Sequence, residues 1–181
     1  MKTLLLGMGN RILSDDAVGV RLAADLARQI GEMPELDVVA ECSVGGLNLL
    51  DVLRGYDRAI VLDSIRTTAG VPGSWYRFDA TVLQDTLHLT NIHDVNLATA
   101  LELGRRLGVP LPAAREIHIF AVEIQDDVTF SECMTPALEQ AYPKFAAQII
   151  DAVRNLLTVG AREHGYRSDS RCARRVRRQC A

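Results

Sequence analysis

The chain has 181 residues, of which 48% are hydrophobic and 24% charged, with a formal net charge of −3, a balance that is ordinary for a soluble globular protein. No apolar run approaches the roughly 18 residues that a membrane span needs. Lys2 is the only basic residue before a strand-length apolar run, and no small-residue cleavage site follows that run, so we expect no signal peptide. The 4 cysteines form no CxxC pair and are too sparse for a disulfide framework, so we expect a cytoplasmic protein with free thiols.

Strand and helix signals alternate along residues 1–65, which is typical of an α/β protein. The continuous apolar run from Lys2 to Leu6 indicates a central parallel strand. The helix after it is expected to begin near Ser14, a good N-cap residue, and to end at Gly31. The remaining expected elements of this part are a strand, a short helix and a strand at 36–40, 47–53 and 59–63.

The alternation breaks after this third strand. Turn residues at 70–73 lead directly into a strand-like segment at 74–79, too soon for the crossover that a parallel strand requires, so that segment is expected to be an antiparallel edge. A helix at 94–107, a strand at 116–124 and a last helix from Pro136 to about Leu157 follow, and Pro143 is expected to kink or split the last helix. These elements predict a three-layer α/β/α sandwich with a five-stranded, mostly parallel sheet and one antiparallel edge strand.

The end of the chain differs in charge from the rest. Residues 160–181 contain seven arginines against Glu163 and Asp169, a formal +5, which leaves −8 on residues 1–159. We expect a single α/β domain at 1–159 and a disordered basic tail at 160–181. Arginines can neutralise phosphates, but no aromatic residues interleave with them, so we expect no nucleic-acid partner. No membrane partner is expected either, and the protein is expected to be a monomer.

The predicted topology brings three potential metal ligands from distant segments to one edge of the sheet. Asp16 follows the first strand, Asp63 ends the third, and His93 begins the helix that leads to the fifth. Open α/β sheets bind ligands in the crevice beyond the carboxyl ends of their strands. Two carboxylates and a neutral imidazole suit nickel, zinc or iron, and they leave positions open for metal-assisted carbonyl polarisation or activation of water.

Each of these residues also has a structural alternative. Asp15 and its neighbour could stabilise a helix N-terminus through the helix dipole, although only one of the two acids is needed for that. A buried Asp63 needs a cation, which Arg11 or Arg66 could supply. His93 could cap a helix or lie on the surface.

Two glycines after the first strand, Gly7 and Gly9, raise the possibility of a phosphate-binding turn. A dinucleotide-binding motif needs a third glycine where this chain has Ile12, and the adjacent carboxylates would repel a phosphate. The glycines could equally provide a tight exit from the strand, with Asn10 tolerating an unusual backbone. The turn is therefore a weak signal for nucleotide binding.

Other chemically capable side chains are less specific. Glu123, Asp126 and Asp127 follow the fifth strand and could line the same crevice or belong to a solvated loop. His118 lies in the middle of a strand, where a satisfied core histidine is expected rather than a ligand. No GxSxG motif and no activated cysteine is present, which argues against a nucleophilic hydrolase.

Taken together, several motifs resemble those of the hydrogenase maturation endopeptidases. In chain order they are GMGNRILSDDAVGV, SVGGLNLL, VLDSI, NIHDVNLATALELGRRLG and IFAVEI. The resemblance covers about residues 3–157. Each motif is modest alone, but their order along the chain is specific.

The resemblance implies which residues act. In that family the second acid of the turn, the aspartate that ends the third strand and the histidine before the third helix bind metal and serve catalysis. In this chain these positions are Asp16, Asp63 and His93. Members often carry glutamate where this chain has Asp16, whose shorter side chain changes the reach. Gly45 and Gly46 match the family's glycine pair and would let a substrate backbone approach closely.

The resemblance also implies an activity and a partner. Such enzymes remove a short C-terminal extension from the large-subunit precursor of a nickel-iron hydrogenase after nickel has been inserted. The nickel then belongs to the substrate, and the three ligands would recognise a loaded precursor rather than hold a resident ion. The alternative is a nickel-handling or nucleotide-binding module without proteolytic activity, which would bind its ligand and shorten no hydrogenase subunit.

Overall fold

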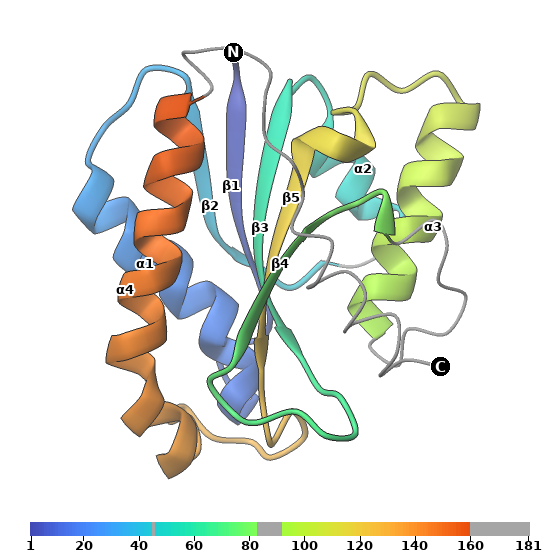
Figure 1. Cartoon of the computed structure of the whole chain (residues 1–181). Coiled ribbons are helices and arrows are strands. Elements are labelled where there is room, and N and C mark those ends of the chain that lie inside the picture. Colours follow the sequence, from blue (N-terminus) through green and yellow to red (C-terminus); the bar gives the residue numbers. More distant parts are fainter. Residues whose placement is uncertain (45, 83–91, 160–181) are drawn as a thin grey trace.

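A single five-stranded sheet forms the centre of the molecule. The computed structural model describes residues 1–44, 46–82 and 92–159, and for residues 92–96, 98 and 159 it describes the backbone alone. The strands lie in the order β2-β1-β3-β5-β4 (Figure 1). Their bounds are β1 (Thr3–Met8), β2 (Leu36–Cys42), β3 (Arg58–Ile65), β4 (Trp75–Asp79) and β5 (Ile117–Glu123). The pairs β1–β2, β1–β3 and β3–β5 are parallel, and β4 is an antiparallel edge strand beside β5, as predicted.

Helices cover both faces of this sheet (Figure 1). On one face lie α1 (Val18–Ile30) and α4 (Pro136–Val159), and on the other lie α2 (Asn48–Leu53) and α3 (Ile92–Arg106). Two short 3-10 helices, η1 (Ser14–Ala17) and η3 (Ala114–Glu116), precede α1 and β5. The predicted three-layer α/β/α arrangement is therefore confirmed.

Strand alternation sorts the buried side chains into two cores, because successive residues point to opposite faces of a sheet. Leu5, Leu62 and Phe120 are fully buried against α1 and α4. Leu4 and Val61 belong to the cluster that packs against α2 and α3. Burying one such side chain stabilises the fold by roughly 1.5–3 kcal/mol. Strands that are apolar on both faces are therefore most stable at the centre of the sheet, where helices cover both faces.

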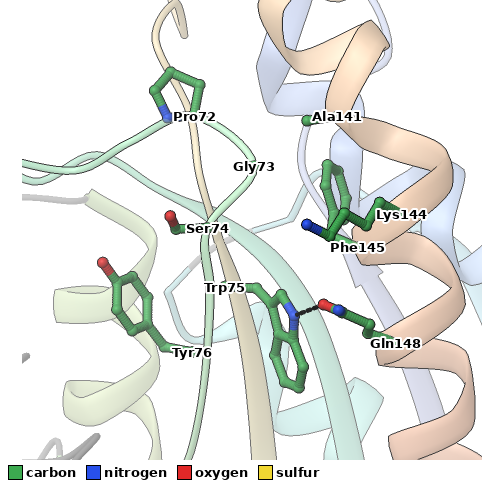
Figure 2. A pocket seen from close by; sticks show the side chains of 9 residues that line it. All are labelled: Pro72, Gly73, Ser74, Trp75, Tyr76, Ala141, Lys144, Phe145 and Gln148. Atoms are coloured by element: carbon green, nitrogen blue, oxygen red, sulfur yellow. Dashed lines mark hydrogen bonds between the residues drawn. The ribbon is translucent and has the colours of Figure 1, made fainter.

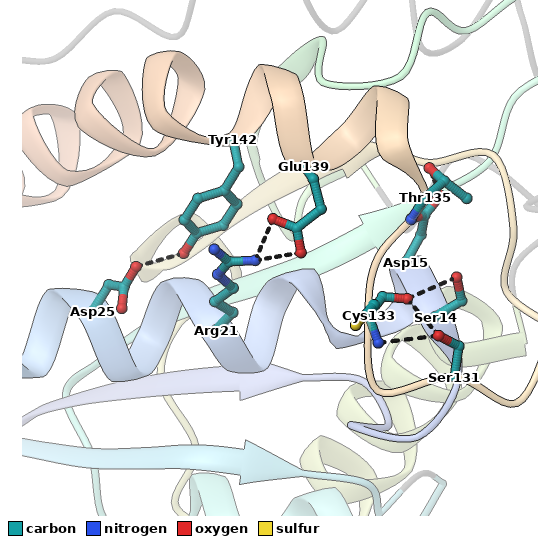
Figure 3. Close-up of polar contacts among 9 residues, drawn as sticks. All are labelled: Ser14, Asp15, Arg21, Asp25, Ser131, Cys133, Thr135, Glu139 and Tyr142. Carbon is teal, nitrogen blue, oxygen red and sulfur yellow. Dashed lines mark hydrogen bonds and ion pairs between the residues drawn. The ribbon is translucent and has the colours of Figure 1, made fainter.

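Polar contacts join α4 to α1 along the outside of the first core (Figure 3). One guanidinium nitrogen of Arg21 lies 2.8 Å from both carboxylate oxygens of Glu139, and its guanidinium group stacks 4.0 Å from the ring centre of Tyr142. The Tyr142 hydroxyl donates a 2.8 Å hydrogen bond to Asp25. Burial and this carboxylate raise the pKa of Tyr142, so the hydroxyl keeps its proton and remains a donor.

One predicted detail is wrong, and one of the two alternatives predicted for Pro143 is excluded. Ser14 does not cap a helix: it begins η1 with a left-handed φ of 44°, and its hydroxyl donates to the carbonyl of Cys133 at 3.4 Å. Pro143 does not split α4, which is continuous through it. Tyr142 and Phe145 flank the proline and are buried in the core that α4 shares with α1, so their packing offsets the backbone hydrogen bond that the proline lacks.

The cysteines of the described chain are thiols, as expected. Cys42 is buried and Cys133 exposed, and both are free. Cys172 and Cys180 belong to the predicted tail at 160–181, which lies outside the described residues. Among the helices in the described ranges, none combines the length and the apolar character that crossing a bilayer requires.

Candidate functional site

The chain connections that leave β1 and β3 lead to opposite sides of the sheet. From β1 the chain passes through α1 to β2, whereas β3 lies on the other side of β1 and the chain continues from it toward β4 and β5. Loops that diverge from adjacent parallel strands open a crevice at the carboxyl edge, the usual ligand site of open α/β sheets. Asp16 follows β1 and Asp63 lies near the end of β3, so the fold places both acids at this edge.

Glycines close the turn between β1 and α1. Gly9 has a φ of 128°, and a Cβ added there would lie 2.0 Å from the carbonyl oxygen of Asp16. A Cβ on Gly19 would lie 2.3 Å from the Met8 carbonyl oxygen and 2.4 Å from that of Leu62. Backbone carbonyl groups of the protein therefore fill the space beside these glycines. Their role is to bring η1 and α1 onto the strand ends, which agrees with the tight exit that was the alternative to a phosphate-binding turn.

Asp15 serves the structure rather than facing the crevice. Its side chain is fully buried, and its carboxylate accepts hydrogen bonds from the backbone N–H groups of Gln125 at 3.1 Å, Asp126 at 3.1 Å and Thr135 at 2.6 Å. The Thr135 hydroxyl donates a further bond of 3.0 Å. Figure 3 shows Asp15 beside Thr135, at the start of α4. One carboxylate thus ties the loop between β5 and α4 to η1.

Ser64, which lies near the end of β3, contacts both Asp16 and Asp63. The Ser64 hydroxyl donates a 2.8 Å hydrogen bond to Oδ1 of Asp16, and the Ser64 backbone N–H donates one of 2.8 Å to Oδ1 of Asp63. Oδ2 of Asp16 accepts the backbone N–H of Asn10 at 2.8 Å. Both acids are buried, with 6% of Asp16 and 4% of Asp63 exposed. Two buried carboxylates from separate segments therefore contact the same serine.

Strand alternation sets the face on which Asp63 lies. Its neighbours two residues away, Val61 and Ile65, belong to the core under α2 and α3, so Asp63 shares their face of β3. The thiol of Cys42 lies in the same core. Burial raises the pKa of this thiol, and the negative charge of Asp63 raises it further, which keeps Cys42 protonated beside the acid.

The arginines proposed as partners of Asp63 have other carboxylates beside them. Arg11 forms an ion pair with Glu41 at 3.1 Å, and Arg66 forms one with Asp127 at 2.7 Å. Three of these four side chains are more than 40% exposed, and that of Asp127 is 25% exposed. The ion pairs link the loop after β1 to the end of β2, and the loop after β3 to the loop after β5.

The acid that ends β5, Glu123, and Asp126 in the loop after it have structural roles. Glu123 is 1% exposed and accepts the Thr67 hydroxyl at 2.6 Å and its N–H at 3.2 Å, so it orders the loop after β3. Hydrogen bonds from Thr129 and from the N–H of Val128 lower the pKa of Asp126, which caps its own turn. None of these hydrogen bonds involves the Asp16 side chain. Asp126 is a half-buried acid whose side chain caps its own turn, and Glu123 is a buried loop anchor.

A shallow groove lies between the β3–β4 connection and α4 (Figure 2). It has a volume of about 470 Å³. The Trp75 indole N–H donates a 2.9 Å hydrogen bond to Gln148 across it, and Lys144 contributes its one charged group. No carboxylate, imidazole or thiol is among its lining residues, so this groove lacks the side chains that usually bind a metal ion.

Of the predicted site residues, two are described only in part or not at all. His93 is the second residue of α3, and its side chain lies outside the described residues. Gly45 lies outside them as well. Gly46 has a φ of 62° and open space around the position of an added Cβ. Among the side chains that the structure describes, no group of three His, Cys, Asp or Glu is placed to hold a metal ion.

Sequence reasoning missed the residues that position the two acids. Ser64 directly follows Asp63, and because side chains alternate along a strand it points to the other face, where η1 lies. This alternation of side chains is the feature of the sequence that could have identified Ser64. Nothing in the adjacent pair Asp15 and Asp16 distinguishes the loop anchor from the acid at the crevice, because the donors to Asp15 come from more than a hundred residues away.

The fold and the acid pair define an open α/β protein with its candidate ligand site at the topological switch point. Residues 20–152 match the family model of the hydrogenase maturation proteases. The chain is 26% identical over 163 residues to the hydrogenase 2 maturation protease of Escherichia coli strain K12, a match that covers 84% of this chain and 96% of that relative. The chain belongs to the hydrogenase maturation protease family.

Solved structures show the same fold. The hydrogenase maturating endopeptidase HybD from E. coli superposes with a TM-score of 0.68 at 24% identity, over 86% of this chain and 93% of that one. The solution structure of an endopeptidase from E. coli gives a TM-score of 0.69 at 25% identity, again over 86% and 93%. The nickel-iron hydrogenase maturation protease HybD from Thermococcus kodakarensis gives 0.61 at 18% identity, over 86% and 99%. The architecture is thus that of endopeptidases.

Proposed function

We propose that this protein is the endopeptidase that removes the C-terminal extension of a nickel-iron hydrogenase large-subunit precursor, and that it acts after nickel has been inserted. Family membership supports the protease activity and the hydrogenase precursor as its substrate. The observation that carries the site assignment is the pair of buried carboxylates, Asp16 and Asp63, held by Ser64 at the switch point.

In this proposal the nickel belongs to the substrate. Asp16 and Asp63 are assigned to recognise it, and His93 is the third ligand. Carboxylate oxygens and a neutral imidazole form a donor set that suits nickel, and each carboxylate oxygen that accepts one hydrogen bond keeps a lone pair. A loaded precursor would supply the cation that these donors bind, and a precursor without nickel would not.

The topology supports His93 as the third ligand. α3 leads from its last residue, Arg106, to the start of β5 at the amino edge of the sheet, so the first turn of α3 lies toward the carboxyl edge. α3 also covers the face of β3 on which Asp63 lies. A histidine in the first turn therefore starts from the correct layer and the correct end of the sheet.

The chemistry needed is hydrolysis of one peptide bond. A metal beside the scissile bond polarises its carbonyl or activates water. The residues of this chain would position the loaded precursor so that the bond after the metal-binding segment lies in the crevice. Holding the reacting groups in place lowers the barrier without a nucleophilic side chain.

The experiment that tests this function compares two forms of one substrate. The purified protein is incubated with a nickel-loaded large-subunit precursor and with the nickel-free precursor, and the mass of each is measured over time. We expect the loaded form alone to lose a C-terminal peptide. No change in the mass of either form would contradict the protease assignment, and equal cleavage of both would contradict nickel recognition.

Single substitutions test which residues form the site. Asp16→Asn, Asp63→Asn and His93→Gln should each stay folded and leave the loaded precursor uncut. Asp51→Asn is the matched control, because Asp51 is an exposed acid on α2, and it should cleave like the wild type. Cleavage at the wild-type rate by all three site variants would exclude this ligand set.

A further inference from the structure

Exposed apolar side chains occur in every loop that leaves the sheet at the carboxyl edge, where the acid pair lies. This holds for the loops after β1, β2, β3 and β5 within the described residues. The side chains, in chain order, are Ile12, then Val44 and Leu47, then Val71, then Val128 and Phe130. Phe130 is 79% exposed and Val128 is 71% exposed. Large apolar groups kept in solvent around one site are typical of a protein-binding surface.

The loop that carries Val128 and Phe130, residues 125–135, is pinned at several points and is called the Phe130 loop below. Ser131 donates its N–H to the Ile12 carbonyl at 3.0 Å, and its carbonyl accepts the N–H of Ser14 at 3.0 Å. The Asp15 carboxylate holds both ends of the loop through its bonds to Gln125, Asp126 and Thr135. Phe130 is therefore presented to solvent from an ordered support.

The same contacts make the Phe130 loop continuous with the candidate active site. Leu13 and Ser131 form a parallel β-bridge, and Asp16 follows Leu13 by three residues on η1. A partner that covers Ile12 and Phe130 would thus lie against the segment that carries the crevice acid. The exposed surface and the acid pair belong to one continuous stretch of structure.

We propose that Ile12, Val128 and Phe130 form a docking surface for the hydrogenase large-subunit precursor, and that they contact a nonpolar surface of the folded precursor next to its C-terminal extension. This inference rests on the proposed function. A metal held by three ligands fixes one point of the substrate, and a second contact is needed to fix the orientation of the peptide bond. Aromatic residues at protein interfaces supply much of the binding energy, which makes Phe130 the expected anchor.

The test compares Phe130→Ser with Leu107→Ser. Leu107 is 67% exposed but follows α3, at the opposite end of the molecule, so its variant is the matched control for the loss of an exposed apolar side chain. With nickel-loaded precursor as the substrate, we expect Phe130→Ser to raise KM by about tenfold or more while kcat changes by less than about twofold. Leu107→Ser should change neither constant. The melting temperatures of both variants should match that of the wild type, because both side chains are exposed.

A binding measurement separates this inference from the proposed function. The dissociation constant of the uncleaved precursor is measured on the Asp63→Asn background, with and without Phe130→Ser, and should rise about tenfold with the second change. If the wild type cleaves the precursor and Phe130→Ser has normal KM and affinity, the docking surface is wrong and the function stands. If the wild type binds the precursor through Phe130 but never cleaves it, the function is wrong and the docking surface stands. A Phe130→Ser variant that only dissociates a dimer of this chain, with normal KM, would also overturn the proposal.

Discussion

The Ser64 hydroxyl donates a 2.8 Å hydrogen bond to the Asp16 carboxylate across 48 positions of sequence. This bond joins the end of β3 to η1, two segments that approach each other only because Gly9 and Gly19 allow close backbone contacts. Since the Ser64 N–H also donates to Asp63, one residue orients both acids of the candidate site. Ser64 is therefore a positioning residue.

Replacing Ser64 by alanine should weaken the site without unfolding the protein. Residues that orient metal ligands typically change metal affinity or activity by about 10–100-fold when they are removed, so we expect processing of the nickel-loaded precursor to slow by about tenfold. Ser64→Thr, which keeps a hydroxyl, should restore most of the rate. Thr158→Ala removes a hydroxyl that bonds to helix carbonyls on α4 and serves as the control. An unchanged rate for Ser64→Ala would show that Asp16 needs no such support.

Asp15→Asn and Asp16→Asn should separate stability from activity. Asp15 is fully buried and accepts four hydrogen bonds, and an amide offers one acceptor oxygen and adds an NH2 group without an acceptor beside it. We expect Asp15→Asn to lower the free energy of unfolding by about 2–4 kcal/mol, measured by urea denaturation. Asp16→Asn should lose processing while its urea midpoint changes less. The reverse ranking would mean that the two acids have exchanged roles.

Gly19→Ala should destabilise the fold because the added methyl group meets backbone. Its Cβ would lie 2.3 Å and 2.4 Å from carbonyl oxygens of β1 and β3, so α1 would have to move off the sheet, at a cost of about 1–3 kcal/mol or more. Gly104→Ala on α3 is the matched control. Its Cβ would meet the tips of the Leu111 and Leu50 side chains at 2.5 Å and 2.6 Å. Those tips can rotate, and alanine favours a helix by about 1 kcal/mol, so the net change should be small. Equal loss of stability in both variants would contradict this distinction.

The sequence predicted the architecture because its strongest signals are physically direct. A continuous apolar run such as Lys2 to Leu6 can be satisfied only in a strand with both faces covered, and the short connection before Trp75 permits only an antiparallel neighbour. Asp63 could be placed at the carboxyl edge because it ends such a run. These predictions depend on local pattern and on chain length alone.

The rest depends on contacts between distant segments, which local pattern does not contain. Ser14 has the composition of an N-cap, yet the backbone of Ser131 accepts its N–H and pulls it into a left-handed conformation. Pro143 would break an isolated helix, but Tyr142 and Phe145 are packed firmly enough to keep α4 continuous. Asp15 became a loop anchor because donors from residues 125–135 converge on it. In each case tertiary packing overrides the local preference.

His118 should make the protein less stable in acid. Burial and, to a smaller extent, the positive charges of Arg77 and Arg58 lower its pKa to about 4, against the opposing effect of Glu116 and Asp79. In the unfolded chain the imidazole titrates near its ordinary value of 6.5, so between these two pH values the unfolded state binds more protons than the folded state.

Stability is therefore complete above about pH 6.5 and is lost as the pH falls toward about 4. The shift corresponds to about 3 kcal/mol for a fully buried group, and the partial exposure of His118 reduces the expected effect to about 1–2 kcal/mol. Urea denaturation of the wild type and of His118→Gln at about pH 7.5 and about pH 5 measures it. Carboxylates contribute acid sensitivity to both proteins, so the quantity of interest is the difference between them. The glutamine variant should lose less stability in acid than the wild type, and identical losses would show that His118 titrates normally in the fold.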